Sequence, residues 1–210
     1  MNRRLTLLTF ALLPTLALGE PAPTATPGTA KAQQVCLTTN HGDIVLELDA
    51  TKAPLTVENF LSYVTKKHYD GTVFHRVMDG FMIQGGDFAV QDGTLVQKTV
   101  GKGITNESQN GLKNERGTVA MARTNDPNSA TAQFFINVVD NAMLDYPNNG
   151  GYAVFGKVVT GMAVVDKIKA QPTGVTKLTM LHPTTGEKMI FPSPNVPATN
   201  VVIVTASIVK

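Results

Sequence analysis

The stretch Tyr69–Val77, YDGTVFHRV, and its continuation Gly80–Asp87, GFMIQGGD, decide the fold class of this chain. Each part contains one short apolar run that is flanked by glycine. Short runs rich in Val, Phe and Ile and bounded by glycine are typical of β-strands joined by turns. We therefore predict two consecutive strands here, and we interpret the adjacent glycines Gly85 and Gly86 as a turn at the end of the second.

The same pattern continues along the chain, with short apolar runs at Val73–Val77, Phe81–Gln84, Thr118–Met121, Phe134–Val138 and Tyr152–Val158. Near its start, Val35–Thr39 and Ile44–Leu48 flank the residues Asn40–Gly42 and predict a β-hairpin. Val201–Val209 predicts a final strand. The chain is thus dominated by short strands.

Two segments instead show the spacing of an amphipathic helix. After Pro54, apolar residues occupy positions 57, 60, 61 and 64, which lie on one face of a helix. Met162–Lys169 shows a similar stripe and ends before Pro172. Many short strands with two helices indicate an all-β barrel or sandwich, in which the helices would close the ends of a barrel. Periodicity by itself does not choose between barrel and sandwich.

The N-terminus has the pattern of an export signal. Arg3 and Arg4 precede the apolar run Leu5–Leu18, and small residues up to Gly19 offer a cleavage site. We therefore expect residues 1–19 to be a signal peptide, 20–33 a linker rich in Pro, Ala and Thr, and 34–210 one globular domain. The apolar run is shorter than a membrane-spanning helix, so no membrane anchor is expected.

Charge and reactive residues exclude several classes of protein. Without Arg3 and Arg4, sixteen basic and sixteen acidic residues remain, so a nucleic-acid-binding protein is not expected. Cys36 is the only cysteine, so no intramolecular disulfide can form, and we interpret it as a buried apolar residue. The four histidines lack the spacing of a zinc site, and no Gly-x-Ser-x-Gly motif indicates a serine hydrolase.

Three blocks of sequence resemble a known family. The opening stretch is similar to the signature of the cyclophilin-type peptidyl-prolyl cis-trans isomerases, and the blocks Met121–Arg123 with Ala132–Asn137, and Val154–Val158, follow in family order and at family spacing. The resemblance runs from Val35 to the C-terminus. It implies a closed eight-stranded antiparallel barrel capped by two α-helices, with a proline-binding groove on the outer face.

The resemblance also implies a set of site residues. Arg76 occupies the position of the catalytic arginine. The apolar Phe81 and the polar Gln84 and Gln133 complete the catalytic set. The residues implied to bind substrate are Met82, Ala122, Phe135, Met143, Leu144 and Tyr152.

Three departures from the eucaryotic pattern resemble the bacterial exported branch of the family. Met143 stands where many members carry Trp, and Tyr152 stands where they carry His. The segment Arg123–Thr131 is one residue longer. Because the missing indole normally contacts the drug, weak cyclosporin binding is expected. The proline-containing segment Thr173–Pro197 is longer than in the family, and we interpret it as an extra surface hairpin or loop.

Strand geometry adds an independent expectation about which side chains share a face. Because side chains alternate along a strand, Gln133 and Phe135 should face the groove while Phe134 and Ile136 face the core. By the same rule His75 should point away from Arg76 and be structural. Rotation about a peptide bond breaks no covalent bond, so no nucleophile, general base or metal is required, and a guanidinium that stays charged suits the task of stabilising the twisted amide.

Together these observations predict a cofactor-free, metal-free, monomeric isomerase of X-Pro bonds. Its partners would be proline-containing unfolded or partly folded polypeptides, encountered after export, most simply in the periplasm, with secretion as the alternative. The alternative is a chaperone or adaptor module that grips proline-containing segments without needing turnover.

Overall fold

The computed structural model describes residues 33–182, 185 and 187–209. The expected signal peptide, residues 1–19, and all of the expected linker except residue 33 lie outside this part of the chain. The strands are β1 (Gln34–Thr39), β2 (Gly42–Leu48), β3 (Thr72–Met78), β4 (Met82–Gln91), β5 (Thr94–Gln97), β6 (Thr118–Met121), β7 (Phe134–Asn137), β8 (Val154–Thr160), β9 (Thr173–Leu181), β10 (Lys188–Pro197) and β11 (Ile203–Ile208). The α-helices are α1 (Pro54–Thr65) and α2 (Met162–Lys169), and the short 3-10 helices are η1 (Ala142–Leu144) and η2 (Asn148–Gly150).

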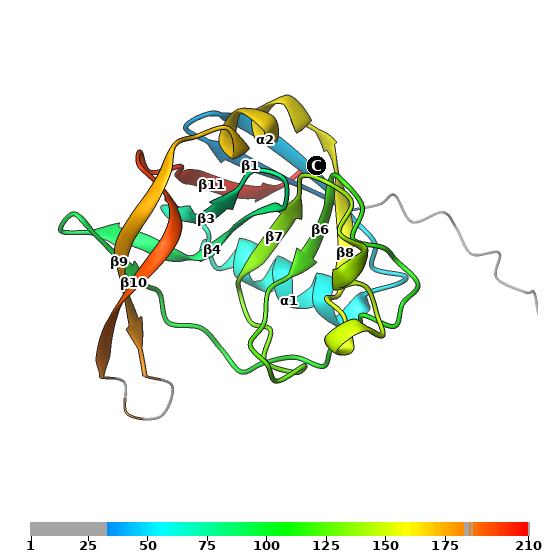
Figure 1. The fold of residues 1–210 in the computed structure, drawn as a ribbon. Coiled ribbons are helices and arrows are strands. Elements are labelled where there is room, and N and C mark those ends of the chain that lie inside the picture. Colours follow the sequence, from blue (N-terminus) through cyan, green and yellow to red (C-terminus); the bar gives the residue numbers. More distant parts are fainter. Residues whose placement is uncertain (1–32, 183–184, 186, 210) are drawn as a thin grey trace, which may run out of the picture. The chain divides into compact units, whose positions relative to one another are not determined.

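The strands form one sheet in the order β10-β9-β5-β4-β7-β6-β8-β2-β1-β11, with β3 paired to β4 (Figure 1). All pairs are antiparallel except β5 with β9, which is parallel. Between β3 and β11 the described residues form no ladder. A single bridge joins Val73 to Val202, and the Phe74 N–H donates to the Val201 carbonyl at 2.9 Å. The predicted all-β fold with two helices is therefore confirmed, while closure of the barrel stays an expectation.

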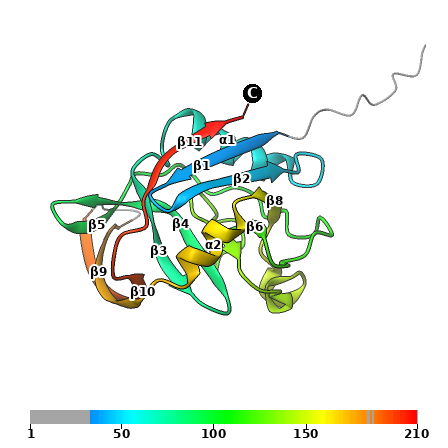
Figure 2. The same cartoon turned by 90° about the horizontal axis from the view of Figure 1, so that it is seen from above.

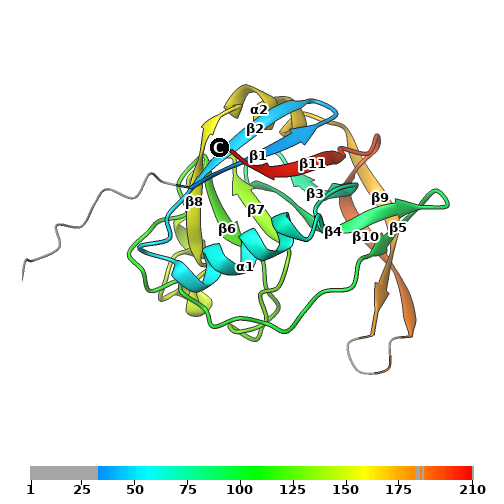
Figure 3. The same ribbon diagram turned by 180° about the vertical axis from the view of Figure 1, so that it is seen from behind.

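The main core lies inside the curved sheet, between the two α-helices. Figures 1 and 3 show α1 and α2 on opposite sides of the strands, and Figure 2 shows α2 from above. Both helices occur where periodicity predicts them, because α1 buries Val57, Phe60 and Val64 and α2 buries Val165 and Ile168. No helix among the described residues is long and apolar enough to cross a membrane.

The prediction of a turn at Gly85 and Gly86 is wrong, because both residues lie inside β4. Gly86 has φ +101°, and a Cβ there would lie 2.9 Å from the Ala132 carbonyl oxygen and 3.0 Å from the Tyr69 ring. The β3–β4 register shifts on both sides of Phe74. The glycines thus let β4 bend and pass close to its neighbours, and the strand continues beyond them.

The interpretation of Cys36 as a buried residue is also wrong. Its side chain is only partly buried, because the alternate residues Val35 and Leu37 are the ones that β1 turns toward the core. The Cys36 sulfur lies 3.9 Å from the Thr38 hydroxyl oxygen, which projects from the same side of the strand.

The segment Thr173–Pro197 contains an antiparallel hairpin, β9–β10, as one of the two interpretations predicts. Its position depends on β5, a strand that the sequence pattern did not reveal. Leu95 of β5 pairs with Leu178 of β9, and these two residues form a second, smaller core with Val73, Phe88 and Val196. The hairpin is therefore anchored to the sheet by apolar packing.

Candidate active site

A pocket of about 160 Å³ opens beside β3, β4 and β7. Its lining residues are Arg76, Phe81, Met82, Gln84, Ala122, Arg123, Phe135, Leu144 and Tyr152. The structure thus brings together eight of the ten residues that the sequence predicted, leaving out only Gln133 and Met143. None of the nine lining residues offers a thiol, an imidazole or a carboxylate.

Strand register places the polar and apolar parts of this pocket side by side. Arg76 of β3 pairs with Gln84 of β4, and Gln84 pairs with Phe135 of β7. Residues directly opposite one another on adjacent strands project to the same face of a sheet. Three residues that lie far apart in sequence therefore converge on the outer face.

The pocket has an apolar wall that is separate from the main core. Met82 and Phe135 are buried against Ala120 and Val154, and Phe81, Ala122, Leu144 and Tyr152 pack on this cluster. Phe134 and Ile136, which flank Phe135, belong to the main core instead. The predicted alternation is confirmed for Phe134, Phe135 and Ile136, whereas Gln133 does not line the pocket.

Arg76 lies at the edge of this wall and is half-buried. Its Nη1 donates to Gln84 Oε1 at 3.3 Å, and its guanidinium carbon lies 6.0 Å from the centre of the Phe81 ring. The neighbouring His75 points the other way, as alternation predicts, and its ring packs 4.6 Å from that of Phe88. Hydrogen bonding and packing thus restrain the guanidinium beside an apolar surface.

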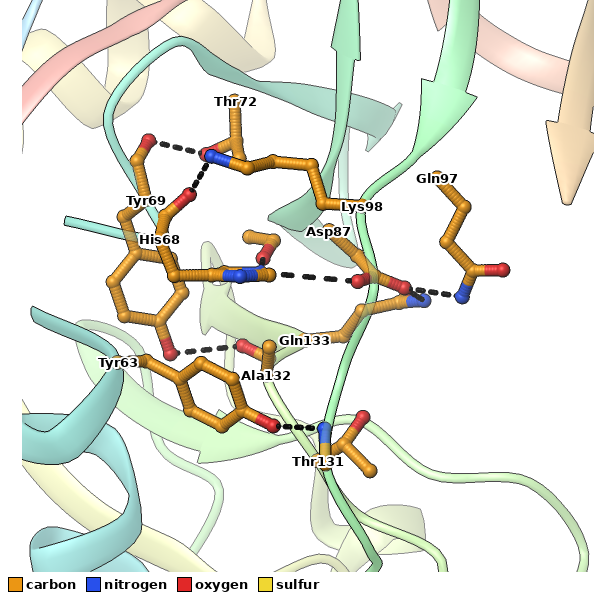
Figure 4. Close-up of polar contacts among 12 residues, drawn as sticks. Tyr63, His68, Tyr69, Thr72, Asp87, Gln97, Lys98, Thr131, Ala132 and Gln133 are labelled. Carbon is orange, nitrogen blue, oxygen red and sulfur yellow. Dashed lines mark hydrogen bonds and ion pairs between the residues drawn. The ribbon is translucent and has the colours of Figure 1, made fainter. Parts of the chain in front are cut away.

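Behind the pocket, Gln84 is the first member of a partly buried series of hydrogen-bonded side chains that ends at the buried Asp87. Its Nε2 donates to Gln133 Oε1 at 2.7 Å, and Gln133 Nε2 donates to Asp87 Oδ2 at 2.9 Å. Figure 4 shows Gln133 and Gln97 directed at the same carboxylate oxygen of Asp87. Gln133 therefore contacts the site through Gln84. Asp87 was not among the predicted site residues, because the two glycines before it indicated a turn.

Arg123 is a second lining residue that the sequence analysis did not assign to the site. Its guanidinium carbon lies 4.4 Å from the centre of the Tyr152 ring, a cation–π contact. Its Nε and Nη2 donate to the Gly151 carbonyl oxygen at 3.1 and 2.9 Å. Arg123 belongs to the block Met121–Arg123 that resembles the family, but only the structure shows that its side chain folds back over Tyr152.

Met143 stands apart from the other predicted residues. It lies in η1, is 67% exposed and does not line the pocket, although its neighbour Leu144 does. A ligand would therefore have to extend beyond the pocket to contact Met143.

Comparison with known proteins agrees with this geometry. The model of the cyclophilin-type peptidyl-prolyl cis-trans isomerase/CLD family matches residues 34–189. The peptidyl-prolyl cis-trans isomerase cyp18 of Streptomyces antibioticus is 58% identical over 145 residues, which are 67% of this chain and 86% of that protein. Peptidyl-prolyl cis-trans isomerase A of Dickeya dadantii is 44% identical over 211 residues and covers the whole of both chains.

Solved structures show the same relationship. A cyclophilin-type peptidyl-prolyl cis-trans isomerase of Cryptosporidium parvum, crystallised in the presence of the dipeptide Ala-Pro, superimposes with a TM-score of 0.66 at 28% identity. The superposition covers 85% of this chain and 99% of that one. The fold, the pocket and the sequence matches lead to one conclusion: this chain belongs to the family of cyclophilin-type peptidyl-prolyl cis-trans isomerases.

Proposed function

We propose that the pocket beside Arg76 is where this isomerase rotates the peptide bond before proline, with the proline ring against Phe135, Met82 and Phe81. The observation that carries the proposal is the position of Arg76, whose Nη1 is hydrogen-bonded by Gln84 at the edge of the apolar wall. A guanidinium keeps its charge and presents several donors in one plane, so it can hold the proline carbonyl and approach the nitrogen together.

The barrier to be lowered arises from resonance in the amide. Rotation about the C–N bond costs about 18–20 kcal/mol and takes tens to hundreds of seconds for X-Pro without a catalyst. In the twisted transition state the nitrogen becomes pyramidal and gains a localised lone pair. A donor that interacts with this lone pair stabilises the transition state and not the planar ground state, which is the condition for catalysis.

Arg76 supplies only part of the required energy. An acceleration of about 10⁵ requires a barrier lower by about 7 kcal/mol, whereas one preorganised donor contributes about 2.7–4 kcal/mol. The remainder is assigned to the wall formed by Phe81, Met82 and Phe135, which disfavours the more polar planar amide. Gln84, supported from behind by Gln133, would hold the substrate chain beside the bond, with Ala122, Leu144 and Tyr152 completing the groove.

A protease-coupled assay with a proline-containing peptide tests the proposal directly. The wild-type protein should accelerate the slow phase that reports conversion of cis to trans X-Pro. A wild-type protein that binds the peptide but leaves this phase unchanged would favour the alternative, a chaperone or adaptor that grips proline segments without turnover.

We also propose that the protein acts after export, on X-Pro segments of unfolded or partly folded exported polypeptides. Support comes from the signal pattern in residues 1–19 and from the Dickeya dadantii relative, which aligns over the whole of this chain, N-terminal segment included. N-terminal sequencing of the protein from separated cell fractions should find it in the periplasm or medium, beginning after residue 19. A protein that begins at Met1 in the cytoplasm would contradict export.

Weak binding of cyclosporin is expected because Met143 replaces an indole. The exposed side chain of Met143 lies next to the pocket residue Leu144, where a larger aromatic group could cover a bound drug. Met143→Trp should therefore tighten binding by about tenfold or more, since burying an aromatic side chain contributes on the order of 1.5–3 kcal/mol. Titration calorimetry measures the change, and an unaltered affinity would show that Met143 does not reach the ligand.

A further inference from the structure

A series of hydrogen-bonded side chains leads from the buried Asp87 to Arg76 in the pocket. Asp87 is 1% exposed, and its Oδ2 accepts from Gln97 Nε2 at 2.6 Å and from Gln133 Nε2 at 2.9 Å (Figure 4). Gln133 Oε1 accepts from Gln84 Nε2 at 2.7 Å, and Gln84 Oε1 accepts from Arg76 Nη1 at 3.3 Å. Every link between Asp87 and Arg76 is therefore a hydrogen bond between side chains.

The two ends of this series differ in the hydrogen bonds that they can make. An arginine side chain only donates, and an ionised carboxylate only accepts. The two glutamines between them each have one donating and one accepting end, and each can turn either way. Only one orientation of Gln84 and Gln133 satisfies both ends. The reverse orientation would turn the Gln84 amide nitrogen toward the guanidinium and the Gln133 carbonyl oxygen toward the carboxylate.

We propose that Asp87 is a positioning residue: its buried carboxylate fixes the direction of the Gln133 and Gln84 amides, and Gln84 thereby presents its carbonyl oxygen to Arg76. The inference rests on the proposed role of Arg76 in isomerisation. Without an acceptor-only group at the inner end, both orientations of the Gln84 and Gln133 amides would be populated. In one of them, Arg76 would lose the hydrogen bond that aims its guanidinium at the proline nitrogen.

Burial and hydrogen bonding act on the Asp87 carboxylate in opposite directions, and burial is the larger effect. Burial raises the pKa of Asp87, while the hydrogen bonds from Gln97 and Gln133 act in the opposite direction. His68 Nε2 lies 4.0 Å from Oδ1 of the same carboxylate, and burial lowers the pKa of His68. The nearby Lys98 ammonium donates to the carbonyl oxygens of His68 and Asp70. Oδ2 of Asp87 therefore accepts both hydrogen bonds, and among the described residues its buried Oδ1 has no hydrogen-bond partner.

The substitution Asp87→Asn tests the inference, because an amide of the same shape can donate or accept and no longer dictates a direction. We expect kcat/KM to fall about tenfold, the lower limit for a hydrogen bond to a charged group. In a Gln133→Met background, where the path to Arg76 is already broken, Asp87→Asn should change kcat/KM by less than about twofold. A purely structural role would reduce kcat/KM equally in both backgrounds, and that result would overturn the inference.

Gln97→Met provides the matched control. It removes the other hydrogen bond to Asp87 Oδ2 and leaves the path through Gln133 and Gln84 intact. This variant should lose stability and keep its kcat/KM within about twofold of wild type. A tenfold loss in Gln97→Met would argue against a directed path through Gln133.

The inference can fail independently of the proposed function. Wild-type kcat/KM in Asp87→Asn, together with the expected large loss of kcat/KM in Arg76→Ala, would overturn only the role of Asp87. Full activity in Arg76→Ala would overturn the proposed function itself. If Asp87→Asn does not fold, nuclear Overhauser contacts in the wild-type protein decide the point. The Gln84 amide protons should contact Gln133, and contact with the Arg76 guanidinium instead would overturn the inference.

Discussion

Replacing Arg76 with alanine is expected to lower kcat/KM for X-Pro isomerisation by about 10²–10³-fold, the factor that follows from losing one preorganised donor worth about 2.7–4 kcal/mol. Folding should change little, because the half-buried side chain makes one hydrogen bond, at 3.3 Å, to Gln84. The protease-coupled assay measures the rate, and urea unfolding measures the stability. Residual activity should remain, since the apolar wall of the pocket is intact in this variant.

Two further variants separate charge from geometry. Arg76→Lys keeps the positive charge but loses the planar fork, so its activity should lie between wild type and Arg76→Ala. Arg116→Ala removes another arginine, which pairs with Asp166 of α2 at 2.9 Å and does not line the pocket, and it should keep wild-type turnover. If Arg76→Ala turned over peptide as fast as Arg116→Ala, the guanidinium would have no part in the reaction.

The second large effect concerns stability in acid. His75 is 5% exposed, and burial, aided by the charge of neighbouring Arg76, lowers its pKa from 6.5 to about 4. In the unfolded chain the ring regains its ordinary pKa, so between about pH 6.5 and pH 4 the unfolded state binds more protons. The stability that depends on a neutral His75 is complete above pH 6.5 and is lost as pH falls toward 4. The loss should amount to about 3 kcal/mol.

This loss is measured as a difference between two proteins. Urea unfolding of wild type and of His75→Gln from pH 7 to pH 4 should show a steeper fall of the free energy of unfolding for wild type. His68, with its lowered pKa, adds to the loss of stability in acid, and Asp87, with its raised pKa, opposes it. Both groups are present in both proteins, so the difference between the two profiles isolates His75. His41→Gln, at the β1–β2 turn, is the matched control for replacing a histidine by glutamine outside the core. Parallel profiles for wild type and His75→Gln would refute the prediction.

Much of the fold follows from local pattern. The spacing of apolar residues in α1 and α2 predicted both helices, because a helix buries one stripe whatever it packs against. Alternation in β7 correctly placed Phe134 and Ile136 in the core and Phe135 on the other face. These properties depend on residues that are neighbours in sequence. They can be read without knowing which strands pair.

Errors occurred where a distant segment sets the conformation. Gly85 and Gly86 have the composition of a turn, yet they lie inside β4. Glycine is required there because Val73 and Phe74 approach Gly85, and Tyr69 and Ala132 approach Gly86, too closely for a Cβ. β5 was missed because its four residues become a strand only by pairing with β4 and β9. Asp87 was missed for the same reason, since its partners Gln133 and Gln97 come from other parts of the chain.

The sequence by itself determined the class of fold, the face that β7 buries and, through family resemblance, eight of the residues that line the pocket. Only the tertiary structure decided that Arg123 folds over Tyr152, that Met143 lies outside the pocket, and that a buried carboxylate orders the amides behind Arg76. The physical reason is that buried apolar residues recur at the spacing of a helix or a strand, and this spacing is visible in a short stretch of sequence. The direction of a hydrogen bond depends on which donor and acceptor the folded chain brings together.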